Sequence, residues 1–193
     1  SLLTTGTSSF GVYLQGNGDR MTNGGSIETR GAGADAVFSN TAGSSFTATV
    51  ENQAGGQIVS RQAAAIRTLN GATTVINAGL LQSDAGTAVS MGTGANTLIL
   101  QTGSTIRGAA DGGGNAATQL LLQGSGTADN AFHRFALLQM QGSAWTWSGG
   151  GVFNAIDIQN GTLTLAGTIG GAAQVRTGAT LAGTGTLTGN VTN

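Results

Sequence analysis

Few side chains in this sequence could act as a nucleophile or as a general base. A Ser–His–Asp triad needs a histidine that takes the serine proton, and the only histidine is His133, next to Arg134. No serine lies in the G-x-S-x-G pattern of a nucleophile elbow. We therefore expect His133 to be an exposed side chain on a coil or loop, and we expect no catalytic residue.

Carboxylates are the other groups with catalytic potential, because a pair of them can hydrolyse a glycosidic bond. The chain has eight, which are scattered along its length: Asp19, Glu28, Asp35, Glu51, Asp84, Asp111, Asp129 and Asp157. They do not recur at one repeat position, and Glu28, Glu51 and Asp84 come nearest to forming a set. A polysaccharide-active enzyme is therefore only the third alternative for the function.

The sequence also offers little for a metal or a cofactor. Calcium needs several oxygen ligands, and the candidates are the segments 17–19 and 111–115, neither of which fits a known calcium loop. Both segments are typical of turns. The glycine run at 112–114 makes no phosphate loop because the chain has no lysine, and the absence of cysteine excludes thiolate ligands. We expect no metal site and no cofactor.

The composition restricts the fold class and the partners. Only 8% of the 193 residues are charged and the net charge is −1, while 39% are hydrophobic, which is not the balance of a disordered segment. The sequence has no basic stripe, so we expect no nucleic-acid partner. It has no 18-residue apolar run, so we expect no membrane span. It has no proline, as expected if nearly every strand is paired on both sides.

Short internal repeats indicate the architecture. An asparagine precedes an aliphatic residue in three successive copies, in the pairs Asn23 and Ile27, Asn52 and Ile58, and Asn77 and Leu81. The middle copy carries a two-residue insertion. Ile106 follows Leu81 after an interval similar to that between Ile58 and Leu81. One such repeat cannot bury its apolar face alone, so the repeats must stack.

These intervals predict an all-β fold, a parallel β-solenoid of eight or nine coils of about 22 residues. Segments such as 47–50, 73–76 and 97–100 are β-branched or aliphatic, as strands require. Asn23, Asn52 and Asn77 would stack as a hydrogen-bonded ladder. The segment 132–140 could form a short helix, but continuation of a strand fits it better.

Two tryptophans two residues apart must share one face of a strand. If Trp145 and Trp147 point inward, they fill the core, and if they point outward, they could stack on sugars. We favour an inward position for at least one of them.

The C-terminal third carries the motifs G-T-L-T-L at 161–165 and G-A-T-L-A-G-T-G-T-L-T-G-N-V at 178–191. With these motifs it resembles the end of the passenger domain of bacterial autotransporters, and the stretch 161–193 is similar to their passenger-associated transport repeat. The stretch 118–160 resembles the part that precedes this repeat, with Phe132 and Trp145 in the expected order. The coils of 21–108 are similar to generic passenger coils. Trp147 departs from the pattern, which has an aliphatic residue there.

The resemblance implies a single-stranded right-handed parallel β-helix exported through an outer-membrane barrel. Residues 1–117 would be stem coils, and residues 118–193 would be an autochaperone-like region that folds first. The folding-core candidates share large apolar side chains in this region: Phe132, Phe135, Trp145, Trp147, Leu163, Leu165, Leu181 and Leu187. Aromatic side chains bury roughly 150–250 Å² each, which favours this end as the more stable one.

Function and partners follow from the resemblance as expectations. The chain would be a non-catalytic stem at the bacterial cell surface, and its partner would be its own outer-membrane barrel. Because it begins at Ser1, we expect a fragment of a longer protein, a monomer whose N-terminal edge frays or pairs with another copy. The alternative is an adhesin, with a role in virulence, whose surface contacts host receptors, matrix or glycans.

Overall fold

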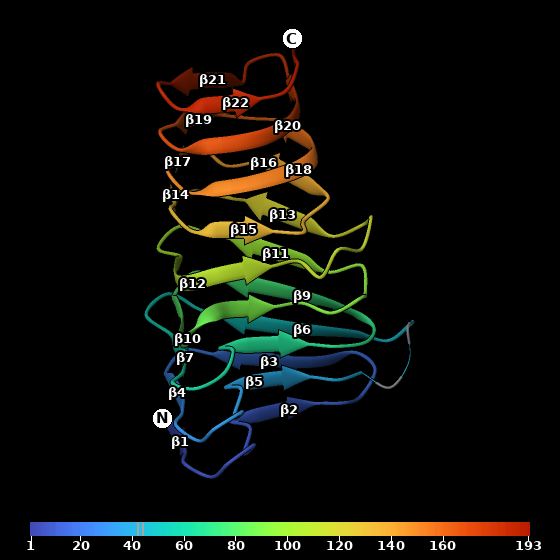
Figure 1. Cartoon of the computed structure of the whole chain (residues 1–193), viewed down its shortest axis with the longest axis vertical. Helices are drawn as coiled ribbons and strands as arrows, with labels where there is room; N and C mark the ends of the chain where they lie inside the picture. Colours follow the sequence, from blue (N-terminus) through green and yellow to red (C-terminus); the bar gives the residue numbers. More distant parts are fainter. Residues whose placement is uncertain (42, 44) are drawn as a thin grey trace.

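The computed structural model describes residues 1–41, 43 and 45–193, and within them the chain forms strands and no helix. All strand pairings are parallel, and they run from each coil to the next. The strands of the near side in Figure 1 point to the right and those of the far side to the left, while the chain rises from the N-terminus to the C-terminus. This sense of rotation makes a right-handed solenoid of about nine turns, as the sequence predicted.

The solenoid has three faces, which we call front, rear and side. The front face, nearest the viewer in Figure 1, contains β2 (Val12–Leu14), β5 (Val37–Ser39), β8 (Ile66–Thr68), the end of β10 (Leu80–Ser90), the end of β12 (Thr105–Asp111), β15 (Ala131–His133), the start of β18 (Gly150–Ile158), the start of β20 (Thr168–Val175) and β22 (Thr186–Thr188). The rear face contains β3 (Asp19–Asn23), β6 (Thr47–Asn52), β9 (Ala72–Asn77), β11 (Thr97–Leu100), β13 (Gln119–Leu122), β16 (Leu137–Met140), the ends of β18 and β20, and β23 (Val191–Thr192).

The side face is divided into two sheets. Its N-terminal part contains β1 (Leu2–Thr4), β4 (Ser26–Thr29), β7 (Gln57–Ser60) and the starts of β10 and β12. A separate four-stranded sheet continues it, formed by β14 (Ser125–Ala128), β17 (Ala144–Trp147), β19 (Thr162–Leu165) and β21 (Thr180–Gly183). On the rear face β11 pairs directly with β13, so strands remain hydrogen-bonded across residues 117 and 118. The proposed division of the chain at this point stays a prediction.

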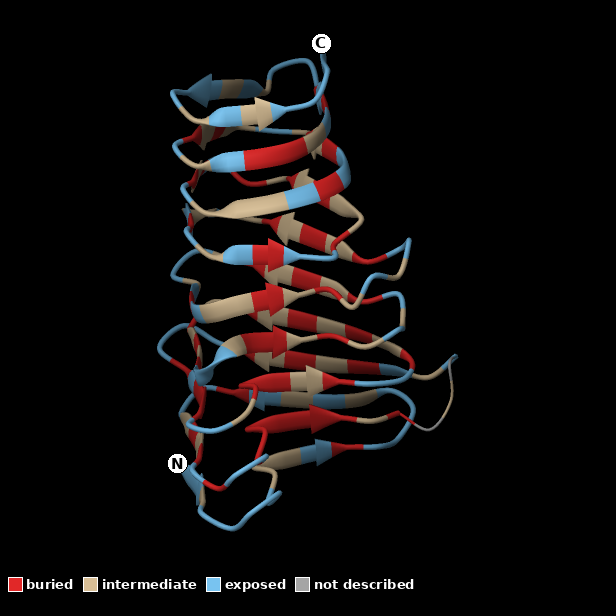
Figure 2. Cartoon of the chain, in the orientation of Figure 1, coloured by how far each residue is buried: buried red, intermediate tan, exposed pale blue. Residues whose placement is uncertain are grey.

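The coils shorten along the chain, which the single coil length predicted from the repeats did not anticipate. Met21 lies beside Val50 in the next coil, whereas Leu120 lies beside Leu138, a clearly shorter interval in the sequence. The long N-terminal coils have wider turns, and several of these turns are pale blue, that is exposed, in the lower half of Figure 2. The two-residue insertion of the second repeat lies in such a turn, at Gly55, so Ile58 keeps its place beside Ile27.

Inward side chains form columns of like residues. On the rear face Val50, Val75, Leu98, Leu120 and Leu138 occupy successive coils, and all are fully buried. Because each side chain stacks on its equivalent in the next coil, one repeat position specifies a continuous strip of core.

The predicted asparagine ladder is confirmed. The Asn23 side-chain amide donates to Asn52 Oδ1, and that of Asn52 donates to Asn77 Oδ1, each at 2.8 Å. Asn77 ends the ladder by donating to Ser104 Oγ. In the next coil the same column continues with Leu100, so a polar strip of the interior becomes aliphatic towards the C-terminus.

Both tryptophans point into the core, as favoured. Trp147 lies between Phe132, with ring centroids 5.0 Å apart, and Phe153, at 5.7 Å. Small residues at the same positions of the preceding coil, Gly126 and Ala128, leave room for the two indoles. The segment 132–140 forms the strands β15 and β16 and no helix, which confirms the strand interpretation.

The folding-core candidates differ in burial. Six of them are buried, namely Phe132, Phe135, Trp145, Trp147, Leu163 and Leu165. Leu181 and Leu187 are only partly buried against the core, because they lie in the last coil, on which no further coil packs. That these residues fold first stays a prediction.

Candidate functional surfaces

Charged side chains on the described surface mainly join neighbouring coils. Arg20 pairs with Glu51, Arg67 with Asp35, Arg134 with Asp111 and Arg176 with Asp157. The last three pairs have N–O distances of 2.6, 2.6 and 2.8 Å. In each of these pairs a carboxylate binds an arginine of an adjacent coil, so the pairs connect the coils at the surface.

The largest charge cluster lies on the side face. Glu28 Oε1 accepts a hydrogen bond from both Arg30 and Arg61, each at 2.9 Å, and Arg61 also reaches Asp84 at 3.0 Å. The hydrogen bonds from Arg30 and Arg61 lower the pKa of Glu28 to about 2, so it is ionised at neutral pH. Glu51 lies apart on the rear face with Arg20. The structure thus brings together two of the three carboxylates that the sequence singled out.

His133 is exposed on β15, as expected, and its strand neighbour in the preceding coil is Asp111. The guanidinium of Arg134, and not His133, holds the Asp111 carboxylate, with hydrogen bonds of 2.8 and 2.6 Å. Ser90 lies beside Asp111 in the coil before it, and among the described residues no side-chain hydrogen bond joins His133 to a serine or to Asp111.

The two calcium candidates are turns, as predicted. Asp19 Oδ2 accepts hydrogen bonds from the backbone N–H groups of Gln15 and Gly16, at 3.0 and 2.7 Å. Asp111 Oδ1 accepts one from the N–H of Gly113 at 2.9 Å. No group of three or more His, Cys, Asp or Glu side chains that could hold a metal ion occurs in the described residues.

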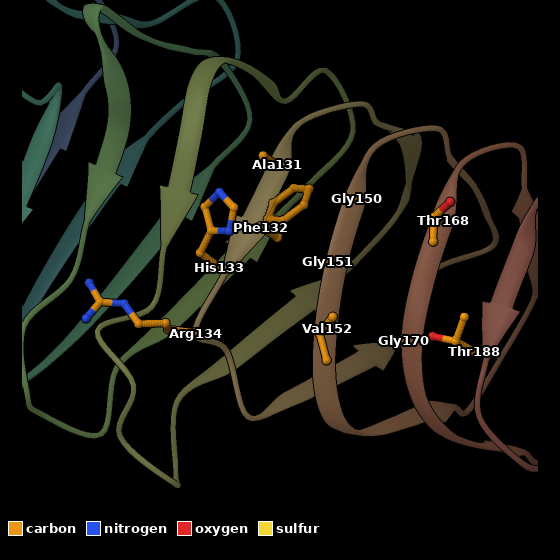
Figure 3. A pocket seen from close by; sticks show the side chains of 10 residues that line it. All are labelled: Ala131, Phe132, His133, Arg134, Gly150, Gly151, Val152, Thr168, Gly170 and Thr188. Carbon is orange, nitrogen blue, oxygen red and sulfur yellow. The ribbon is translucent and has the colours of Figure 1, made fainter.

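A first hollow lies on the front face near the C-terminus, with a volume of about 390 Å³. Figure 3 shows His133 on one side and Thr168 and Thr188 on the other, with Val152 standing between them. Gly150 and Gly170 line the hollow without a side chain, so the surface is lower at these two positions.

A second hollow, of about 320 Å³, lies nearer the N-terminus and includes Asp35, Arg67, Ser90 and Asp111 in its lining. Asp35 is buried, and burial raises the pKa of its carboxyl group although the N–H of Ala64 and Arg67 both donate to it. Sequence reasoning missed this grouping because Asp35 and Asp111 are three coils apart. An alignment of the repeats could have predicted this grouping, because Arg67, Ser90 and Asp111 occupy the same outward position in successive coils.

A comparison of the chain with family models, curated proteins and solved structures found no match. A search of the described residues for a helix long and apolar enough to cross a membrane found none. The function must therefore be inferred from the solenoid and from its surface.

Proposed function

We propose that this chain is the non-catalytic β-helical stem of a bacterial autotransporter passenger. Its C-terminal coils, 118–193, promote folding and secretion across the outer membrane, and the stem presents upstream regions at the cell surface. Its partner during export is its own outer-membrane barrel. The proposal rests on the resemblance of 161–193 to the passenger-associated transport repeat, and these residues lie in the last coils of a right-handed parallel β-solenoid.

The distribution of the core residues supports the folding role. The C-terminal coils bury four aromatic side chains, those of Phe132, Trp145, Trp147 and Phe153. In the N-terminal coils one interior column consists of asparagine side chains. Burial of apolar surface stabilises by about 25 cal/mol per Å², so the aromatic coils gain more per residue than the polar ones. In a solenoid, folding can begin at the most stable coils and propagate to their neighbours.

Export from cells tests this proposal. The 193-residue chain is fused through Asn193 to the outer-membrane barrel of an established autotransporter and expressed with a secretion signal. Trp147→Ser should strongly reduce the amount of protease-resistant chain at the cell surface, because it opens the buried core of the C-terminal coils.

Ile58→Ser is the matched control, since Ile58 is equally buried but lies in an N-terminal coil. Surface display should be less affected by this variant. Equal display of both variants at equal losses of stability in vitro would contradict a special role of the C-terminal coils.

A further inference from the structure

The outward residues of the front face form a single column whose chemistry changes along the solenoid. From the N-terminus its members are, in register, Tyr13, Phe38, Arg67, Ser90, Asp111 and His133. Beyond His133 the column continues over Val152 and Gly170 to Thr188. Both hollows described above therefore lie on this one face.

The hollow between Arg67 and Asp111 combines a small apolar floor with polar walls. Ala63, Ala64 and Ala85 contribute only methyl groups to its lining. Thr87 and Ser90 also line it, and among the described residues their hydroxyl groups make no hydrogen bond. Arg67 adds donors and Asp111 adds acceptors, so a ligand here meets both kinds of group.

The charges in this hollow are already paired. Arg67 lies 2.6 Å from Asp35, and Arg134 lies 2.6 Å from Asp111. A polyanion would find no unpaired cation, and a cation would find no unpaired carboxylate, among the described residues that line it. A small apolar floor with both donors and acceptors suits an uncharged molecule with many hydroxyl groups, such as a sugar.

An aromatic cluster borders the hollow on its N-terminal side. The Phe38 ring lies under the guanidinium of Arg67, 5.2 Å from the ring centroid, and stacks with Tyr13, whose ring centroid is 5.5 Å away. Tyr13 is 47% exposed. The Tyr13 side chain combines an apolar ring with a polar hydroxyl group, a combination that is common at hydrated interfaces.

The arrangement favours a linear ligand. From Ser90 in the second hollow to Gly170 in the first hollow is four coil steps, or about 19 Å at ~4.8 Å per step, so an oligosaccharide can span both hollows but a monosaccharide cannot. A peptide strand fits less well, because strand addition needs a free sheet edge. The backbone of this face is used in pairing between coils.

We propose that the front face binds an uncharged linear glycan that lies along the solenoid axis, with its main sugar site between Arg67 and Asp111. This binding role goes beyond the stem function proposed above and does not depend on it. The stem would then contact a glycan-bearing surface directly as well as hold other regions away from the cell.

Titration of the purified 193-residue chain, labelled with ¹⁵N, tests the proposal. The probes are four neutral hexasaccharides, of β-1,4-glucose, α-1,4-glucose, β-1,4-mannose and β-1,4-N-acetylglucosamine, together with a heparin hexasaccharide. At least one neutral probe should shift the amide signals of Ser90, Asp111 and Gly170 and saturate with a Kd of about 0.1–1 mM, or roughly −4 to −5.5 kcal/mol.

Ser90→Leu, which fills the hollow from a half-buried outward position, should weaken this binding at least tenfold. Thr74→Leu is the matched control, since Thr74 is also outward and half-buried but lies on the rear face. Ala85→Leu, which enlarges an exposed residue of the lining of the hollow, replaces Ser90→Leu if circular dichroism shows that the latter unfolds. Saturation by heparin alone, binding by none of the neutral probes, or equal binding by the front-face and rear-face variants would overturn the proposal.

Discussion

At the scale of single residues, the C-terminal core depends on small residues that face large ones. Trp145 is buried over Gly126, its partner in the preceding coil. A Cβ atom added to Gly126 would lie 2.9 Å from two carbon atoms of the Trp145 ring. The indole therefore occupies space that any other residue at position 126 would take.

Gly126→Ala should destabilise the chain by about 1–3 kcal/mol, because overpacking forces the surrounding side chains to shift. The Trp fluorescence spectrum should change with it, since an indole has to move. Gly25→Ala is the control, because a Cβ atom there meets nothing within 4 Å. Equal urea midpoints for the two variants would show that the ring adapts without cost.

The asparagine ladder allows a second prediction at this scale. Asn52→Leu should cost about 1–3 kcal/mol, because it removes the 2.8 Å hydrogen bond on each side of the ladder. The Asn23 amide then keeps only its backbone carbonyl acceptors, and Asn77 Oδ1 keeps only the N–H of Gly79. Asn160→Leu changes an exposed turn residue and should stay within about 0.5 kcal/mol of the parent chain. Urea unfolding followed by circular dichroism measures both, and a neutral Asn52→Leu would mean that the ladder adds nothing to stability.

At the scale of elements, the hydrogen bonds and ion pairs of the surface carboxylates, within coils and between them, make stability depend on pH. The arginine partners lower the pKa of Glu28 to about 2, and hydrogen bonds also lower the pKa values of Asp84 and Asp157. A carboxyl whose pKa is depressed on folding binds fewer protons in the folded chain than in the unfolded chain. Its contribution to stability is complete above the unfolded pKa of about 4.3 and is lost as the pH falls towards 2.

The urea concentration at the unfolding midpoint should therefore decrease as the pH is lowered from 5 to 2. Glu28→Gln should flatten this decline, because it removes the carboxyl group whose pKa is lowered to about 2. Asp129→Asn is the control, since Asp129 is exposed and forms no ion pair among the described residues. Because these pairs are largely exposed, added salt at about 1 M should weaken the dependence as well. Equal pH profiles for the two variants would contradict the assignment to Glu28.

Strands and register were predictable where one residue type repeats. Asn23, Asn52 and Asn77 align in the structure as their spacing indicated, since a repeated buried amide has its hydrogen-bond partner only in that alignment. The shortening of the coils was not predictable, because turn length is set by loops that carry no periodic signal. The hollow at Asp35 and Asp111 was missed for a related reason, since neighbours across coils are distant in sequence.

At the scale of the whole molecule, the solenoid joins coils of unequal composition through the same parallel ladder. Its rear sheet is continuous from β3 to β23. Its side face is interrupted between β12 and β14, where the four-stranded sheet begins. Stability in such an array is roughly the sum of the coils and of the interfaces between neighbours. The weakest interface then decides whether the chain unfolds in one step or in two.

We expect two steps in urea, with the N-terminal coils unfolding first. Both tryptophans lie in β17, so their fluorescence reports the C-terminal coils, whereas far-UV circular dichroism reports all coils. The fluorescence midpoint should lie at a higher urea concentration than the dichroism midpoint, because the coils with the aromatic core around Trp147 should be more stable than the coils with the asparagine ladder. Gly126→Ala should lower the fluorescence midpoint more, and Asn52→Leu the dichroism midpoint more. If all curves coincide in the parent and in both variants, the solenoid unfolds as one cooperative unit, and the C-terminal coils then have no separate stability from which folding could start.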